Sequence, residues 1–239
     1  MCGIAGFYTD THINPSHVDT VKDMLSRIQH RGPEREGIWS DKKVVLGHAL
    51  LSIIGVGTGQ QPLSNNKSTI WVTFNGEIYN HRQLRISLEK KGYVFRTNTD
   101  TEVLVYLYEE YGSDLVHHLN GMFSFAIWDA YQEKLFLARD RLGVKPLFLA
   151  RSGNNFFFAS ELKALKASGI DLGAIDAQAI MNYLRFKHVG AARSIYCGVI
   201  KVPPAHTVVI QKNDLRFERY WTPSPRTPMI IPTRASERL

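Results

Sequence analysis

The sequence is poor in cysteine and has no long apolar run, and each shortage excludes a class of protein. Only two cysteines, Cys2 and Cys197, occur in 239 residues, which is too few for a disulfide scaffold. No window reaches the roughly 18 uninterrupted apolar residues of a membrane span. The N-terminus also lacks the basic and apolar regions of a secretory signal. We therefore expect no membrane partner and a cytoplasmic, reducing location.

The basic residues are dispersed along the chain, and part of their excess lies near the C-terminus, in the segment from Lys201 onward. The lysines and arginines outnumber the acidic residues by 29 to 22, for a net charge of +7. However, no Lys/Arg-rich run of about five to eight residues marks a nucleic-acid site, so no nucleic-acid partner is expected. A contact face for an acidic protein surface fits the excess at least as well. No group of ligand residues has metal-site spacing, and His48 is interpreted as a packing residue within a strand.

Three helices are predicted in the first half of the chain. The first begins near Ser16, where apolar residues start to recur at near-helical spacing. The second covers about His81 to Lys91, and the third covers about Thr101 to Tyr111. Thr99 and Glu102 have the spacing of a capping box at the start of this third helix.

The rest of the chain is rich in β-branched and aromatic runs separated by turn residues, which indicates strands. The predicted strands are Lys43–Ile53, Thr69–Phe74, Met122–Trp128, Leu135–Arg139, Pro146–Ala150 and Phe156–Ala159. The turns between consecutive strands are short and polar, which favours antiparallel hairpins over parallel crossovers. The sequence therefore predicts an α+β fold in which stacked sheets are covered by helices.

Cys2 directly follows the initiator methionine, and this position has a chemical consequence. If Met1 is removed, the thiol and the α-amino group lie on one residue, so a nucleophile and a base are within reach of each other. The ordinary pKa of that amine, about 8, suits it to take the thiol proton and return it. A small buried cysteine in a first strand explains Cys2 equally well. Cys197, in a strand-like run, is interpreted as a core residue.

Further motifs decide between these alternatives. Their order and spacing resemble the glutaminase half of asparagine synthetases, a class II glutamine amidotransferase domain, over roughly residues 1 to 221. The motifs are Met1–Gly6, His30–Pro33, Asn75–Asn80, Thr99–Glu102, Arg139–Leu147, Ala159–Leu165, Val202–Pro204 and Tyr220–Trp221.

The resemblance implies a fold and a reaction. The implied fold is that of N-terminal nucleophile hydrolases, a four-layer αββα sandwich of two antiparallel sheets spanning residues 2–221. In the implied reaction, the cysteine attacks the side-chain amide of glutamine, ammonia leaves, and water resolves a thioester to glutamate. Ammonia then reaches a synthetase domain that amidates aspartate with ATP. No cofactor is expected in the domain itself, because ATP and Mg belong to the synthetase domain.

The resemblance also assigns roles to individual residues. Asn75 and the backbone N–H of Gly76 would form the oxyanion hole, and a plain turn after a strand is the structural alternative for this pair. Asp100 would bind the α-ammonium of glutamine, and Glu77 would face polar atoms of the substrate. Arg31 would order the loop around the nucleophile.

Three more substrate-binding positions follow from the resemblance: Ile53, Thr99 and Leu50. Leu50 stands where the family usually has an arginine that grips the glutamine α-carboxylate. Losing such a charge-assisted contact costs about 1.5 to 3 kcal/mol, so glutamine affinity should fall by one to several orders of magnitude. A catalytically weakened regulatory or partner module is therefore the alternative to an active glutaminase.

The family's synthetase domain has a pyrophosphate-binding loop, Ser-Gly-Gly-Leu-Asp-Ser, that does not occur in this sequence. Residues 222–239 instead form a linker or tail, with four prolines within eleven residues from Thr222. We expect either a fragment cut in the linker or a domain that delivers ammonia to a separate partner.

Overall fold

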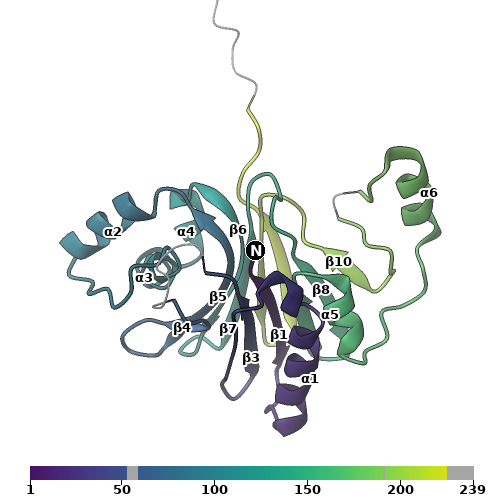
Figure 1. The fold of residues 1–239 in the computed structure, drawn as a ribbon, viewed down its shortest axis with the longest axis horizontal. Coiled ribbons are helices and arrows are strands. Elements are labelled where there is room, and N and C mark those ends of the chain that lie inside the picture. The colour runs from purple at the N-terminus through teal and green to yellow at the C-terminus, as the bar shows by residue number, and fades with distance from the viewer. Residues whose placement is uncertain (53–58, 191, 225–239) are drawn as a thin grey trace, which may run out of the picture.

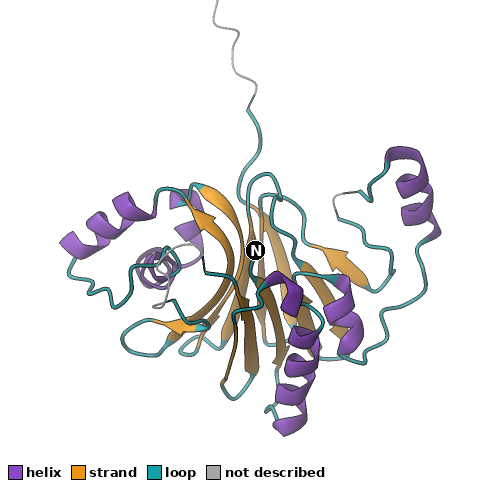
Figure 2. Ribbon diagram, in the orientation of Figure 1, coloured by secondary structure: helices purple, strands orange, loops and turns teal. Residues whose placement is uncertain are grey.

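The computed structural model describes residues 1–52, 59–190 and 192–224. Two six-stranded antiparallel sheets are stacked face to face, and helices cover their outer faces (Figure 1; Figure 2). This is the four-layer αββα sandwich of the predicted fold class, which is therefore confirmed.

Each sheet is continuous from edge to edge. The first sheet has the order β10 (Val199–Lys201), β8 (Phe148–Ser152), β9 (Asn155–Ala159), β1 (Gly3–Thr9), β3 (Val44–Leu50) and β2 (Arg35–Ser40). The second has the order β12 (Asp214–Arg219), β11 (His206–Gln211), β7 (Lys134–Arg139), β6 (Gly121–Asp129), β5 (Ile70–Ile78) and β4 (Leu63–Ser64).

The helices divide between the two outer layers. Those on the first sheet are α1 (Pro15–Ser26) and α5 (Leu162–Ala167), with the short 3-10 turn η1 (Gln29–Arg31) after α1. Those on the second sheet are α2 (His81–Lys90), α3 (Glu102–Tyr111) and α4 (Leu115–His118), with η2 (Gly112–Asp114) before α4. Helix α6 (Ala177–Phe186) projects from one side (Figure 1). Among the described residues, no helix has the length and apolarity to cross a membrane.

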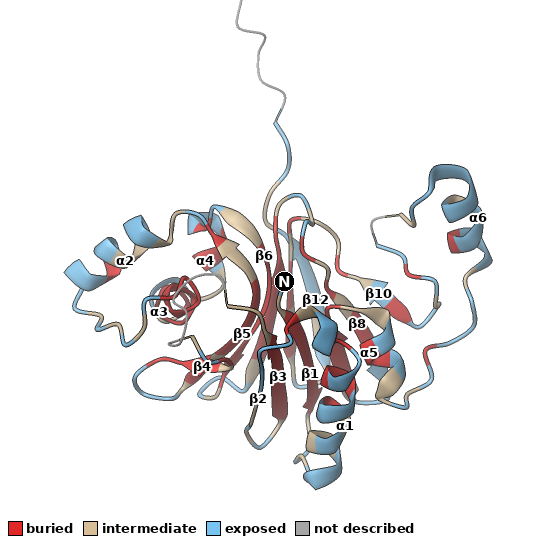
Figure 3. Cartoon of the chain, in the orientation of Figure 1, coloured by how far each residue is buried: buried red, intermediate tan, exposed pale blue. Residues whose placement is uncertain are grey.

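Strand β1 is buried along its whole length, because the second sheet covers one of its faces and α1 and α5 cover the other (Figure 3). Side chains alternate between the two faces of a strand. Ile4 and Tyr8 therefore pack between the two sheets, whereas Ala5 and Phe7 pack under α1 and α5. The N-terminal strand is thus fixed by both layers of core, and it brings Cys2 to the edge of the sandwich.

The predicted capping box at α3 is wrong. Thr101 is the N-cap residue, and no side chain caps the helix. The Glu102 carboxylate instead accepts hydrogen bonds from the backbone amides of Arg96 and Thr97, at 2.8 and 2.7 Å. The Thr99 hydroxyl lies 2.9 Å from the Thr97 hydroxyl. Tertiary contacts with the preceding loop therefore replace the local cap.

Three other local predictions need correction. Strand β5 continues to Ile78, so Asn75 and Gly76 lie inside a strand and not in a turn after it. Helix α1 begins at Pro15 and is capped by Asn14, one residue before the predicted start. Cys197 is exposed and is not a core residue, because it lies in the irregular segment that leads into β10.

His48 joins the two sheets through a buried polar contact, as its interpretation as a packing residue predicts. Its Nδ1 on β3 lies 3.1 Å from the Thr73 hydroxyl on β5, which in turn donates to the Gly47 carbonyl at 3.0 Å. The imidazole is fully buried, and this burial lowers the pKa of His48 to about 3. The neutral ring is therefore part of the folded core.

This burial predicts a pH-dependent stability. Below the ordinary histidine pKa of about 6.5, the unfolded chain binds a proton at His48 that the folded chain does not. The free energy of unfolding should therefore fall by about 1.4 kcal/mol per pH unit from this residue between about pH 6 and pH 4. Urea unfolding at several pH values measures the slope.

His48→Gln should reduce the slope by that amount. The exposed His12→Gln is the matched control and should leave it unchanged. An identical slope in the wild type and His48→Gln would contradict a buried neutral imidazole.

Candidate active site

One pocket brings together most of the residues that the sequence singles out. It lies where the N-terminus meets the ends of β3 and β5, the loop before α3, and the loop from β7 to β8. Its lining is formed by Met1, Cys2, Leu50, Leu51, Ser52, Gly59, Gln61, Phe74, Asn75, Gly76, Glu77, Thr99, Asp100, Thr101, Met122 and Lys145. Residues distant in the sequence therefore converge on Cys2.

The Cys2 thiol is held against the backbone that follows β3. Its sulfur lies 3.5 Å from both the amide nitrogen and the carbonyl oxygen of Leu51. Burial raises the pKa of this thiol above its ordinary value, although the Leu51 amide acts in the opposite direction. With Met1 in place, the environment therefore favours the neutral thiol.

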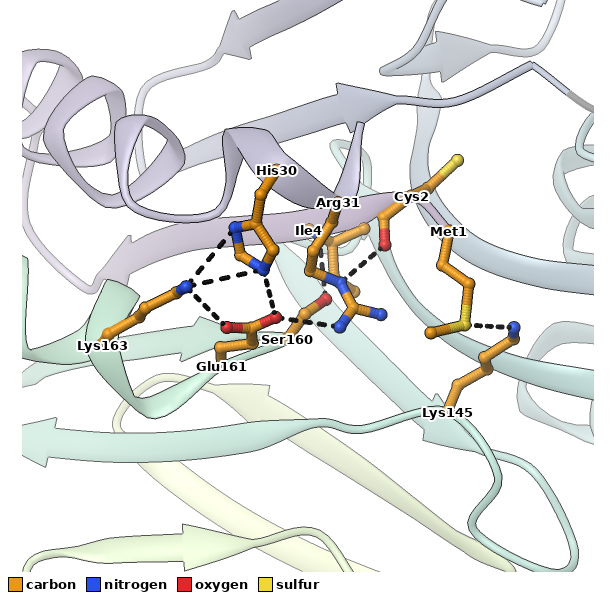
Figure 4. Close-up of polar contacts among 9 residues, drawn as sticks. All are labelled: Met1, Cys2, Ile4, His30, Arg31, Lys145, Ser160, Glu161 and Lys163. Carbon is orange, nitrogen blue, oxygen red and sulfur yellow. Dashed lines mark hydrogen bonds and ion pairs between the residues drawn. The ribbon is translucent and has the colours of Figure 1, made fainter. Parts of the chain in front are cut away.

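Arg31 lies outside the lining but fixes the backbone of Cys2 (Figure 4). Its Nε donates to the Cys2 carbonyl at 3.0 Å, and its Nη1 pairs with Glu161 Oε1 at 3.0 Å. Glu161 also contacts His30 and Lys163, at 3.0 and 3.2 Å. In Figure 4, the Cys2 carbonyl points toward Arg31, whereas its sulfur points away. Arg31 therefore positions the chain and leaves the thiol free.

Ser160 fastens the same strand one residue further along. Its hydroxyl accepts a hydrogen bond from the Ile4 amide at 3.0 Å, and its own amide donates one to the Ile4 carbonyl at 2.9 Å. Ser160 and Glu161 are neighbours at the end of β9, so this dipeptide holds residues 2 to 4 from one side. We refer to Arg31, Ser160 and Glu161 as the N-terminal clamp.

Asn75 contributes a buried side-chain amide to the lining of the pocket. Its side chain is only 1% exposed, yet neither its amide nitrogen nor its amide oxygen has a hydrogen-bond partner among the described residues. Buried polar atoms without partners are rare in proteins and call for an explanation. Gly76 follows it in the pocket, and a Cβ here would lie 2.3 Å from the Met122 carbonyl oxygen.

Asp100 places a carboxylate in the lining of the pocket. One of its oxygens accepts the Ile78 amide at 2.9 Å, which ties the start of α3 to the end of β5. Burial raises the pKa of Asp100 above its ordinary value. Among the described residues, no lysine or arginine pairs with it, so its charge is available to a cationic ligand group. Thr99 and Glu77 line the pocket beside it.

Leu50 does line the pocket, at the end of β3. An apolar side chain therefore occupies the position at which the sequence resemblance expects an arginine. Ile53, the remaining predicted substrate-binding residue, lies outside the residues that the structure describes.

Sequence reasoning gave no role to two pocket residues, Gln61 and Lys145. Gln61 is buried. Its Oε1 accepts a hydrogen bond from the Phe74 backbone amide at 2.7 Å, and its Nε2 donates one to the Thr101 hydroxyl at 3.2 Å. Gln61 therefore bridges β5 and the start of α3. Lys145 is only 5% exposed, and burial lowers its pKa. Its position in the Arg139–Leu147 motif was a signal, but only the fold brings it to Cys2.

Comparison with known proteins identifies the family. A family model described as a glutamine amidotransferase domain matches residues 1–221. The chain belongs to this family. The amidotransferase domain is 38% identical to asparagine synthetase (glutamine-hydrolyzing) 1 of Bacillus subtilis strain 168, over 92% of the chain and 35% of that relative. It is 35% identical to synthetase 3 of the same organism, again over 92% of the chain. The chain thus spans about a third of the length of these relatives.

A solved structure supports the same fold. Glutamine phosphoribosylpyrophosphate amidotransferase from Bacillus subtilis, in complex with ADP and GMP, matches the amidotransferase domain with a TM-score of 0.69. The match covers 93% of this chain and 50% of the other, at 21% sequence identity. It places the domain in the N-terminal nucleophile hydrolase fold, as the sequence resemblance implies.

The N-terminal clamp predicts a local stability effect. Glu161→Ala removes the ion pair that holds Arg31 against the Cys2 carbonyl, so the start of β1 should open more often. A hydrogen bond to a charged group contributes roughly 1.5–3 kcal/mol, which corresponds to about tenfold or faster amide exchange there. Hydrogen-exchange mass spectrometry of peptides covering residues 2–8 measures this.

Lys163→Met is the matched control, because it touches the same carboxylate but leaves the Arg31 contact in place. Unchanged exchange in Glu161→Ala would show that the clamp does not hold the N-terminal strand.

Proposed function

We propose that this domain hydrolyses glutamine to glutamate and ammonia with Cys2 as the nucleophile. Ammonia then passes to an ATP-dependent amidation of aspartate, or of a similar acid, on another domain or chain. The observation that carries the proposal is the buried, unpartnered amide of Asn75, which lines one pocket with Cys2. A donor of this kind suits an oxygen that gains negative charge during acyl transfer.

The proposed reaction begins with removal of Met1, which frees the α-amino group of Cys2. That amine takes the thiol proton, and the thiolate attacks the side-chain carbonyl carbon of glutamine. The resulting oxyanion is stabilised by the Asn75 amide and the Gly76 N–H. The α-ammonium returns its proton to the departing nitrogen, so ammonia leaves and a thioester remains. Water, deprotonated by the same amine, then attacks the thioester and releases glutamate with the thiol restored.

The pocket also supports a position for the rest of the substrate. The Asp100 carboxylate would pair with the α-ammonium of glutamine, with Thr99 and Glu77 beside it. The α-carboxylate would approach Leu50, which offers it no charge. Ile53 remains a proposed contact from sequence alone. We therefore propose weak glutamine binding by a chemically complete nucleophile site.

The acceptor reaction is proposed from the relatives, which are named glutamine-hydrolyzing asparagine synthetases. In this proposal the domain needs no cofactor for hydrolysis, and ATP and Mg serve the synthetase domain. Leu50 also favours a second candidate, a regulatory or partner module that keeps the fold but has lost efficient glutamine use. The two candidates differ in whether Cys2 catalyses repeated hydrolysis of glutamine.

The rate of glutamate release from glutamine tests the proposal. The protein should be used after mass spectrometry confirms that Met1 is absent. Wild type should hydrolyse glutamine with a high KM, and Cys2→Ala should be inactive. Leu50→Arg should lower KM by about ten- to a hundredfold, because a charge-assisted contact contributes roughly 1.5–3 kcal/mol. If all three proteins are inactive, the module is the better description.

Asn75→Ala tests the oxyanion contact separately. It should lower kcat by roughly 10²–10³-fold, because the donor acts mainly in the transition state. KM should change little. Asn80→Ala, which alters a solvent-side contact to the His118 carbonyl, is the control and should retain the wild-type kcat. A kcat for Asn75→Ala within twofold of wild type would contradict the role given to Asn75.

A further inference from the structure

Lys145 places an ammonium group in the pocket without an acidic partner. The residue is 5% exposed, and its Nζ contacts Met1 Sδ at 3.2 Å (Figure 4). Among the described residues, no carboxylate lies within ion-pair distance of this Nζ, whereas the Arg31 guanidinium is paired with Glu161. A thioether is only a weak acceptor. The Lys145 charge is therefore compensated less than that of Arg31.

The backbone of Lys145 is fixed from both sides. Its amide donates to Asp140 Oδ2 at 2.9 Å, and its carbonyl accepts from Arg139 Nε at 2.7 Å. Arg139 also donates to the carbonyls of Gly143 and Val202, at 2.6 and 2.5 Å. This network holds the loop between β7 and β8 in one conformation. The position of the Lys145 backbone, from which the side chain enters the pocket, is thus set by contacts that do not involve Met1.

Removal of Met1 changes what the Lys145 ammonium faces. The methionine whose sulfur it contacts is bonded directly to the Cys2 nitrogen, and Met1, Cys2 and Lys145 line the same pocket. Without Met1, the nitrogen becomes a free amine, and the thioether contact is lost. A positive charge nearby stabilises a thiolate and opposes protonation of an amine. The first effect favours the thiolate that attacks the amide, and the second keeps the resting amine free to accept the thiol proton.

We propose that the Lys145 ammonium is the charge that keeps Cys2 reactive after Met1 is removed, by stabilising the thiolate and by keeping the α-amino group unprotonated. This rests on the proposed function, because it takes Cys2 as the nucleophile. Lys145 acts through Cys2 and transfers no proton itself.

The other charges near Cys2 show why one more cation is needed. The charged groups facing it from the surrounding elements are Asp100 before α3, Glu77 on β5, Arg31 of η1 with its partner Glu161, and Lys145. Burial and the Asp100 carboxylate both raise the pKa of the Cys2 thiol, whereas the Leu51 amide, the N-terminal ammonium of Met1 and Lys145 lower it. Removal of Met1 takes away that ammonium, and Glu161 pairs with Arg31. Among the described side chains that line the pocket, Lys145 is then the cation that offsets Asp100.

The pH profile of thiol alkylation tests this without glutamine. Iodoacetamide is neutral and reacts with the thiolate, so its rate against pH reports the pKa of the thiol. The Cys197→Ser background removes the other cysteine, which is exposed. Met1-free wild type is compared with Lys145→Met and Lys145→Gln, which remove the charge, and with Lys145→Arg, which keeps it. Lys163→Met is the control, because this half-exposed lysine pairs with Glu161.

Both neutral variants should raise the midpoint of the profile by about one pH unit, as expected for one charge several ångströms away at an effective dielectric constant near 20. Lys145→Arg and Lys163→Met should retain the wild-type midpoint. Near-UV circular dichroism identifies the variants that fold. Two neutral substitutions are used so that the test still holds if one of them fails to fold.

An unchanged midpoint in a folded neutral variant would overturn the proposal. The same holds if Lys145→Met raises only the KM for glutamine, because Lys145 would then bind substrate. Failure of the proposed function gives a different result, namely a shifted alkylation midpoint in a protein whose wild type releases no glutamate.

Discussion

The site depends on holding one end of a polypeptide still. Chain ends usually fray, because they have neighbours on one side only. Here the first strand, β1, lies between β3 and β9 in the middle of a sheet, and it is buried on both faces. Arg31 and the Ser160–Glu161 dipeptide then fasten residues 2 to 4 by side-chain contacts. Cys2, the proposed nucleophile, is thereby attached to a rigid core strand.

In this arrangement, one cation holds the Cys2 backbone and another brings a charge, unpaired among the described residues, to the pocket. Arg31 contacts the carbonyl of Cys2, and its charge is balanced by Glu161, so it fixes geometry. Lys145 contacts only the leading methionine and is not balanced by a carboxylate within the described residues. In the same pocket, Asp100 is a buried acid that accepts a hydrogen bond from the backbone amide of Ile78 on β5. The pocket therefore combines an anion, a cation and an unpartnered amide around one thiol.

Much of the fold and of the site could be predicted from the sequence, because the motifs are short and depend on local structure. Runs of β-branched and aromatic residues predicted six strands, and apolar residues at helical spacing predicted three helices, all near their observed positions. The ordered motifs predicted the sandwich. Local rules failed where tertiary contacts compete with them. Glu102 binds the preceding loop and does not cap its helix, and β5 runs on through Asn75 and Gly76 because β6 pairs with it along that whole length.

The sequence by itself determined the chemical inventory: a cysteine in second position, an Asn-Gly pair, a helix-start aspartate and a leucine at position 50. It also determined the family, because these residues occur in a fixed order. Only the tertiary structure decided which side chains of the whole sequence contact one another. Lys145 and Gln61 reach the pocket, Arg31 and Glu161 combine behind it, and Cys197 remains at the surface. These outcomes depend on contacts between residues as many as 144 positions apart, which no local pattern records.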